Sequence, residues 1–201
     1  TPLARPARAA SVFDPLTGRT GTAALRAGTT GPEVFLALQP GESTILCTFT
    51  DRAPASPAWE YCQPAGPARE ITGRWHVEFL AGGSVLPASY QTERLGSWTS
   101  STDTAAPAFA GTARYSLRFD GSDDTGQRWR LDLGKVCQSA RVRLNGSDLG
   151  VFITPPFQVL TGPLLARGNL LEVEVTSVAA NRIRDLDRRG VSGRTSTTST
   201  L

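Results

Sequence analysis

Aromatic and planar polar side chains are the residues of this chain whose chemistry suits recognition of a sugar ring. The C–H face of a pyranose is apolar and stacks on an aromatic ring, while planar amide and guanidinium groups bond to its hydroxyls. Trp75 and Trp129 lie in strand-like runs that favour the core, whereas Trp98 lies in a loop and is expected to be exposed. The predicted carbohydrate-binding residues are Trp98, Asn145, Asn181, Arg182 and Asp185. The alternative is that the polar members of this set fix turns and domain contacts.

A nucleophilic Ser–His–Asp site would have to use His76, the single histidine of the chain. No Gly-x-Ser-x-Gly sequence, the turn that presents a nucleophilic serine in many hydrolases, accompanies it. His76 follows Trp75 in a strand-like run. We therefore expect a partly buried histidine with a structural role.

The acidic turn DGSDDTG at 120–126 offers carboxylate and carbonyl oxygens that could hold a calcium ion. Asp120, Asp123 and Asp124 are the candidate ligands. The turn lacks the full spacing of an EF-hand loop and its closing Glu, so a solvated acidic turn is the alternative. A structural calcium ion is thus a weak hypothesis, and no other cofactor is expected.

The three cysteines match no metal-ligand spacing. Three free thiols are expected, because spacing alone does not establish proximity, and the alternative is that Cys47 and Cys62 pair across a loop of hairpin size. Cys137 is expected to be a small buried residue in a strand-like run.

Charge and hydropathy exclude two classes of partner. Lys and Arg number 21 against 18 Asp and Glu, a net charge of +3, which gives no strong field for phosphates. The arginines of 181–194 are interspersed with aspartates, the pattern of a solvated surface. No run approaches the roughly 18 apolar residues of a membrane span. We therefore expect neither nucleic-acid binding nor a membrane span.

Short apolar runs recur after residue 71, with turn residues between them. The predicted strands are 75–79, 113–119, 129–133, 140–144, 149–153 and 170–175. Several alternate strictly, which indicates one wet and one buried face, and Asn145-Gly146 is a strong hairpin signal. Because no helical segment lies between these runs, we predict an all-β fold, a two-sheet β-sandwich of jelly-roll type.

The chain before this sandwich reads as a smaller β region. Runs at 33–38 and 43–49 flank a Pro-Gly turn and predict a hairpin, whereas 1–32 contain no convincing strand pair. Four prolines between residues 51 and 69 indicate a linker or boundary, which Trp59 and Tyr61 can pin against one neighbour. We assign 1–66 to the remainder of a preceding sheet domain, 67–191 to the sandwich, and 192–201 to a disordered tail.

The order of the motifs in the second region resembles a known domain. The motifs are GTARY at 111–115, WRLDLG at 129–134, ARVRLNG at 140–146, LG at 149–150, PPF at 155–157 and GN at 168–169. This order resembles the sugar-binding-like jelly-roll domain of glycoside hydrolase family 2, also called galactose-binding-like. Two further stretches are similar to the C-terminal region of glycoside hydrolase family 106, the α-L-rhamnosidases. They are VFDPLTGR at 12–19 with LQPGES at 38–43, and SVAANRIRDLDRRG at 177–190.

The resemblance implies a role beside a catalytic barrel, because the catalytic Glu pair of the family belongs to that barrel and no segment here matches it. The expected function is a non-catalytic portion of a secreted or periplasmic hydrolase, inactive alone, that supports the barrel and contacts rhamnose-containing glycans. Alternatives are an independent carbohydrate-binding module and a purely structural or interaction domain. The chain begins at Thr1 without Met, which favours an internal fragment, and 192–201 depart from the family pattern, which suggests a shifted reading frame.

Overall fold

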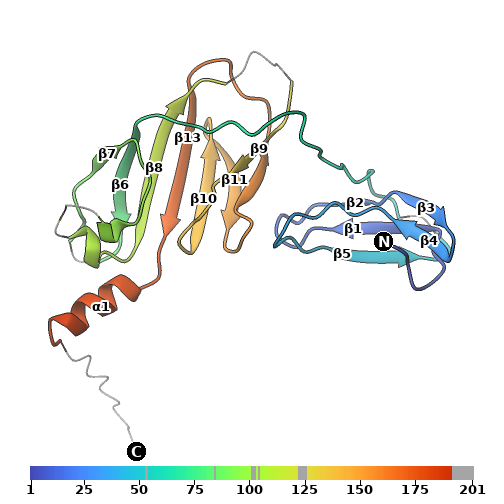
Figure 1. Ribbon diagram of the computed structural model, residues 1–201, viewed down its shortest axis with the longest axis horizontal. Helices are drawn as coiled ribbons and strands as arrows, with labels where there is room; N and C mark the ends of the chain where they lie inside the picture. The colour runs from blue at the N-terminus through green and yellow to red at the C-terminus, as the bar shows by residue number, and fades with distance from the viewer. Residues whose placement is uncertain (53, 84, 101–102, 104, 122–125, 192–201) are drawn as a thin grey trace, which may run out of the picture. The chain divides into compact units, whose positions relative to one another are not determined.

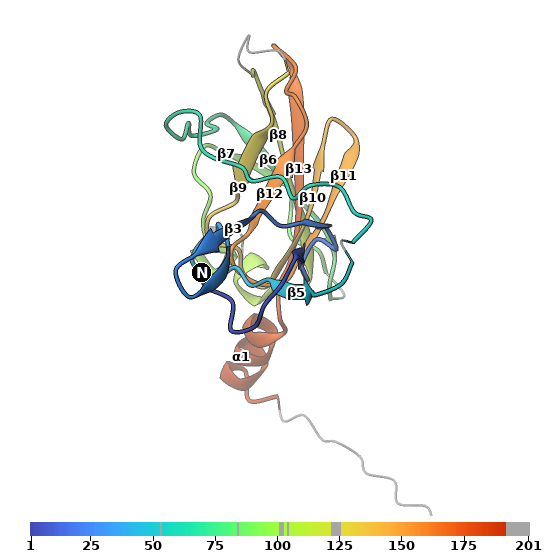
Figure 2. The ribbon, with the colours of Figure 1, turned by 90° about the vertical axis from the view of Figure 1, so that its right-hand side faces the viewer.

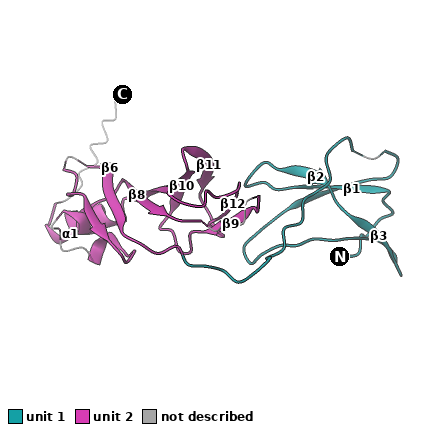
Figure 3. Cartoon of the chain, turned by 90° about the horizontal axis from the view of Figure 1, so that it is seen from above, with its two compact units in different colours: residues 1–70 teal, residues 71–201 magenta. Residues whose placement is uncertain are grey.

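The computed structural model describes residues 1–52, 54–83, 85–100, 103, 105–121 and 126–191. The chain divides into two compact units, residues 1–70 and residues 71–201, which Figure 3 draws in teal and magenta. Strands dominate both units, which confirms the all-β prediction. Residues 1–70 form the first unit and residues 71–201 the second unit. Among the described residues, no helix has the length and apolar character needed to cross a membrane.

The first unit contains a three-stranded antiparallel sheet and a separate hairpin (Figure 1). The sheet has the order β2-β1-β5, formed by β1 (Ala9–Phe13), β2 (Thr20–Thr22) and β5 (Ile45–Phe49). The hairpin joins β3 (Leu25–Gly28) to β4 (Gly31–Val34). The buried core of this unit consists of Ala10, Val12, Ala23 and Val34.

The hairpin predicted between 33–38 and 43–49 is wrong. The turn exists, since the Glu42 N–H donates to the Gln39 carbonyl at 2.9 Å, but the chains on either side of it pair elsewhere. One flank forms β4, which pairs with β3, and the other forms β5, which pairs with β1. The expectation that 1–32 hold no strand pair fails for the same reason, since β1 and β2 pair within them. The Pro-Gly turn was therefore outweighed by the pairing of β4 with the adjacent β3 and of β5 with the more distant β1.

The proline-rich segment after β5 is tied to the first unit. The Thr22 N–H donates to the Pro57 carbonyl at 2.7 Å, and the Trp59 N–H donates to the Thr22 carbonyl at 2.8 Å. Trp59 also packs against the core, and Arg19 lies 5.0 Å from the centre of its ring. Backbone hydrogen bonds and ring packing therefore hold this segment along β2.

The second unit is built on a six-stranded antiparallel sheet of order β11-β10-β13-β8-β6-β7. Its strands are β6 (Trp75–Ala81), β7 (Tyr90–Thr92), β8 (Thr112–Phe119), β10 (Ser139–Leu144), β11 (Ser147–Phe152) and β13 (Asn169–Thr176). A two-stranded sheet pairs β9 (Trp129–Asp132) with β12 (Gln158–Thr161). Side chains of this smaller sheet, Leu131 and Val159, pack against the core.

Alternation sets the faces of the large sheet as predicted. Val142 is fully buried while its neighbour Arg141 is exposed, and Leu117 and Val173 lie on the same buried face. The hairpin between β10 and β11 turns at Asn145 (φ 52°) and Gly146 (φ 80°). Two positive φ angles are what a type I′ turn requires, so the predicted hairpin is confirmed.

A nine-residue helix, α1 (Ala180–Arg188), follows β13, and the sequence reading missed it (Figures 1 and 2). The helix has no side-chain cap at its start, and its three arginines obscure the apolar period. It ends in a left-handed glycine, Gly190 (φ 69°), with the Val191 N–H donating to the Leu186 carbonyl. The charged residues of 182–188 thus lie on a helix without buried residues.

Candidate functional site

Trp98 is buried, so the expectation that its ring is exposed is wrong. A short 3₁₀ turn, η1 (Trp98–Ser100), places the ring edge-to-face against Phe79 and Phe109, at centroid distances of 5.8 and 5.3 Å. The indole N–H donates to the Tyr115 hydroxyl, and burial raises the pKa of Tyr115 to about 12. This aromatic group covers the part of the large sheet around β6. Only 7% of Trp98 is exposed, so no free ring face remains for a sugar.

Helix α1 carries Asn181, Arg182 and Asp185 at one end of the second unit. The Asn181 amide donates to the Phe109 carbonyl at 3.4 Å, which ties the helix to the aromatic group around Trp98. Asp185 pairs with Arg189 at 2.8 Å one turn later, and Arg182 is exposed. Two of the three side chains therefore have structural partners.

Asn145 lies at the opposite end of the large sheet. Its side chain accepts from the Leu170 N–H at 2.8 Å and donates to Asn169 Oδ1 at 3.0 Å. Helix α1 follows the last residue of β13, whereas Asn145 contacts its first two. Eight residues at about 3.3 Å per residue separate these ends by about 23 Å. The predicted carbohydrate-binding residues therefore do not converge on one site.

The calcium hypothesis falls mostly outside the described residues, because Asp123 and Asp124 lie there. Asp120 accepts a hydrogen bond from the Gly168 N–H at 2.8 Å, which ties Asp120 to the residue before β13. Within the part of the chain that the structure describes, no three His, Cys, Asp or Glu side chains gather as a metal site.

The cysteines are free, so the alternative of a Cys47–Cys62 disulfide does not hold. Cys137 is exposed, and the prediction that it is buried is wrong. It lies in a bend before β10 begins at Ser139, so the alternation of the strand does not reach it.

His76 is exposed, which contradicts the expectation of partial burial. Its neighbours Trp75 and Val77 point into the core, so strand alternation turns His76 outward. The cross-strand partner of His76 is Ser116 on β8. An exposed histidine on the solvent-facing side of a sheet lacks the enclosure that nucleophilic catalysis requires.

The outer face of the large sheet is a network of arginines and carboxylates. Glu174 on β13 accepts from Arg143 at 2.9 Å and from Arg114 at 3.1 Å, and its side chain is only 17% exposed. Partial burial by itself would raise the pKa of Glu174, but the hydrogen bonds from the two arginines outweigh it and lower the pKa. Asp148 pairs with Arg141 at 2.6 Å, and this hydrogen bond lowers the pKa of Asp148. These groups form a preorganised, ion-paired surface.

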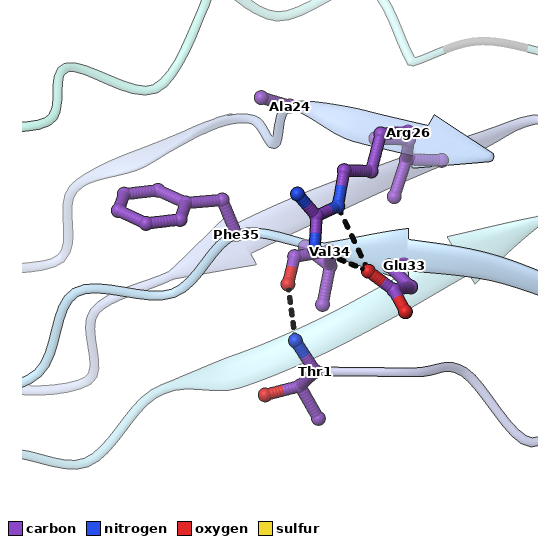
Figure 4. A pocket seen from close by; sticks show the side chains of 7 residues that line it. Thr1, Ala24, Arg26, Glu33, Val34 and Phe35 are labelled. Atoms are coloured by element: carbon purple, nitrogen blue, oxygen red, sulfur yellow. Dashed lines mark hydrogen bonds and ion pairs between the residues drawn. The ribbon is translucent and has the colours of Figure 1, made fainter. Parts of the chain in front are cut away.

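A hollow of about 330 Å³ lies beside the β3–β4 hairpin of the first unit (Figure 4). Its lining residues are Thr1, Ala24, Leu25, Arg26, Glu33, Val34 and Phe35. The hairpin register places Arg26 opposite Glu33, and the guanidinium donates to Oε2 of Glu33 from Nε at 2.8 Å and from Nη2 at 2.7 Å. Phe35 is 52% exposed. The sequence did not predict this site, because Thr29-Thr30 is not one of the residue pairs that mark a two-residue hairpin turn.

Comparison with known proteins finds no family model that matches the chain. A putative beta-glucuronidase of Formosa agariphila is 31% identical over 131 residues, which cover 60% of this chain and 11% of that protein. The structure of a rhamnosidase from Novosphingobium sp. PP1Y superposes with a TM-score of 0.73 at 26% identity. That match covers 98% of this chain and 19% of the rhamnosidase.

Both similar proteins are named as glycoside hydrolases, and the chain spans less than a fifth of each. In sequence and in fold, the chain is therefore related to a β-rich portion of glycoside hydrolases.

Proposed function

We propose that the chain is a non-catalytic β-sandwich portion of an α-L-rhamnosidase-like glycoside hydrolase. Its role would be to support a catalytic barrel domain that lies in another part of the same protein. One observation carries this proposal: nearly the whole chain matches a limited part of a rhamnosidase, with a TM-score of 0.73. The similarity of its C-terminal motifs to glycoside hydrolase family 106 agrees with it. As part of such a hydrolase, the chain would be secreted or periplasmic.

Three described carboxyl groups are held as charged hydrogen-bond acceptors. Glycoside hydrolysis needs two carboxyl groups across the scissile bond, and one of them acts as an acid with a raised pKa. Asp103, Asp148 and Glu174 are the described carboxyls with a displaced pKa, and in all three the pKa is lowered. The hollow at the β3–β4 hairpin is lined by one carboxylate, Glu33, which is already paired with Arg26.

The outer face of the large sheet suits the supporting role. Interfaces between domains of one chain are more polar than those of obligate complexes. Glu174 bonds to both Arg114 and Arg143, and these bonds order the three side chains. A neighbouring domain could therefore bind them without first having to order them. We propose this face as the contact with the catalytic barrel.

Activity measurements on the purified chain test the proposal directly. We expect no release of nitrophenol from nitrophenyl α-L-rhamnoside or nitrophenyl β-D-glucuronide above the buffer blank. Sustained turnover that increases with protein concentration would overturn it.

A second experiment uses the gene. Sequencing the DNA on both sides of this chain should find a catalytic barrel in the same reading frame. Expressing the barrel with and without residues 1–191 should then show lower thermal stability of the shortened protein. An unchanged melting temperature and activity would remove the supporting role.

A further inference from the structure

Phe35 is an exposed aromatic ring that the fold holds in place. Tyr61 meets it edge-on at a centroid distance of 5.0 Å. The Tyr61 hydroxyl donates to the Phe35 carbonyl at 3.0 Å and accepts from the Ala24 N–H at 3.1 Å. With 52% of the residue exposed, part of the ring still faces solvent. A ring ordered by its neighbours but open to solvent is a suitable platform for an apolar ligand face.

Arg26 and Glu33 place a hydrogen-bond donor and an acceptor at the same hollow (Figure 4). Both contacts between the two side chains use Oε2 of Glu33, so Nη1 of Arg26 and Oε1 of Glu33 enter no hydrogen bond with the described residues. Gly28 makes this geometry possible, because a Cβ atom there would lie 2.6 Å from Cγ of Glu33. The Glu33 side chain is 23% exposed and the Arg26 side chain 81%, so the guanidinium projects into solvent.

We propose that this hollow binds one pyranose ring of a neutral glycan. The C–H face of the ring packs on Phe35, and a hydroxyl of the same ring accepts a hydrogen bond from Nη1 of Arg26. The charges of Arg26 and Glu33 cancel each other, and the Thr1 amine at the hollow is bonded to the Val34 carbonyl at 2.8 Å, so we assign an uncharged sugar rather than a uronic acid to this site. A volume of about 330 Å³ is near the lower end of the roughly 300–1,000 Å³ typical of ligand pockets, which suits a single ring. The proposal rests on the proposed function, since a glycoside hydrolase is the protein that meets such glycans.

The test is a titration of the whole chain, labelled with ¹⁵N, followed by amide NMR. L-Rhamnose, methyl α-L-rhamnoside and D-glucuronate are the probes. We expect saturable shifts with the two neutral sugars at amides of 24–35 and at Tyr61, and weaker binding of glucuronate. A flat response to all three probes overturns the proposal, and preferred binding of glucuronate overturns its neutral ligand class.

Variants locate the binding. Phe35→Ala should weaken the binding of methyl rhamnoside about tenfold, which is the worth of one aromatic contact. Arg26→Met, which keeps the apolar stem, should have a similar effect. Phe13→Ala is the matched control, since Phe13 is 38% exposed in β1 and does not line the hollow. Equal affinity of Phe35→Ala and the original chain overturns the site.

A second variant and a second measurement separate loss of binding from loss of folding. Phe35→Leu retains an apolar side chain without the ring, so it should fold if Phe35→Ala does not and should still lose affinity. Shifts confined to 71–191 would overturn this hollow while leaving the proposed function intact. Turnover of a nitrophenyl glycoside would instead overturn the proposed function, whatever the titration shows.

Discussion

The two units differ in the length of their strands and in the size of the side chains that form their buried cores. In the second unit, six strands of up to eight residues place bulky side chains such as Leu117 and Phe152 on one continuous face. In the first unit, strands of three to five residues bury two alanines and two valines. The first unit compensates with bonds from its proline-rich segment along β2. Long strands supply their own stability, whereas short strands depend on the segments that cover them.

The solvent-facing sides of the sheets in the two units also differ. The large sheet of the second unit faces outward with ion pairs that bridge three strands through Glu174. The first unit instead leaves Phe13 and Ile45 half-exposed at facing positions of β1 and β5. This contrast leads to four predictions, in order of decreasing effect.

The largest expected effect comes from Leu117→Ala in the second unit. Leu117 is 2% exposed on a central strand, and the change removes buried apolar contacts and leaves a cavity. The free energy of unfolding of this unit should fall by about 2–5 kcal/mol. Urea unfolding followed by amide NMR measures the two units separately. If both units lose stability equally, the division into independently stabilised units is wrong.

The second prediction concerns the buried amide of Asn169. Its side chain accepts from the Leu165 N–H at 2.9 Å and donates to the Leu165 carbonyl at 2.8 Å, and the residue is fully buried. Asn169→Ala leaves these groups unsatisfied and should cost about 1–3 kcal/mol of unfolding free energy. Asn181→Ala is the matched control, because Asn181 makes one long bond near the surface. Equal losses in thermal unfolding would show that burial does not set the cost.

The third prediction tests how the first unit depends on its covering segment. Tyr61→Phe keeps the ring beside Phe35 and removes the hydroxyl that bonds to Phe35 and Ala24. We expect a loss of about 1 kcal/mol, confined to the first unit. Faster amide hydrogen exchange in β3 and β4, with unchanged exchange in β10 and β13, would be the signature. Uniformly faster exchange would contradict it.

The smallest effect is a pH dependence of the second unit. Because the folded pKa of Glu174 is lowered from its ordinary 4.5, its ion pairs stabilise the folded state above that pH. This contribution should disappear as the pH falls below 4.5 and through the lowered pKa. Unfolding midpoints measured at falling pH should decline less in Glu174→Gln, which has no carboxyl to titrate there. An identical decline in the variant would show that other groups carry the acid sensitivity.

Local signals in the sequence predicted much of the second unit. Alternation along 140–144 and 170–175 gave the strands and their buried faces, because each face is set by a period of two residues. Asn145-Gly146 predicted its turn, since few residue pairs accept two positive φ angles. In these segments the conformation is set by residues that are close together in the sequence.

Tertiary structure decided what depends on distant partners. β5 pairs with β1 rather than across the Pro-Gly turn, and Trp98 is covered by Phe79 and Phe109. The hollow, too, exists only because Phe35 follows a hairpin that joins Arg26 to Glu33 while Tyr61 approaches from another segment. The sequence by itself determined which residues face inward along each long strand, because that depends on backbone geometry alone. Which chains meet depends on the packing of side chains far apart in sequence, and only the folded structure contains that information.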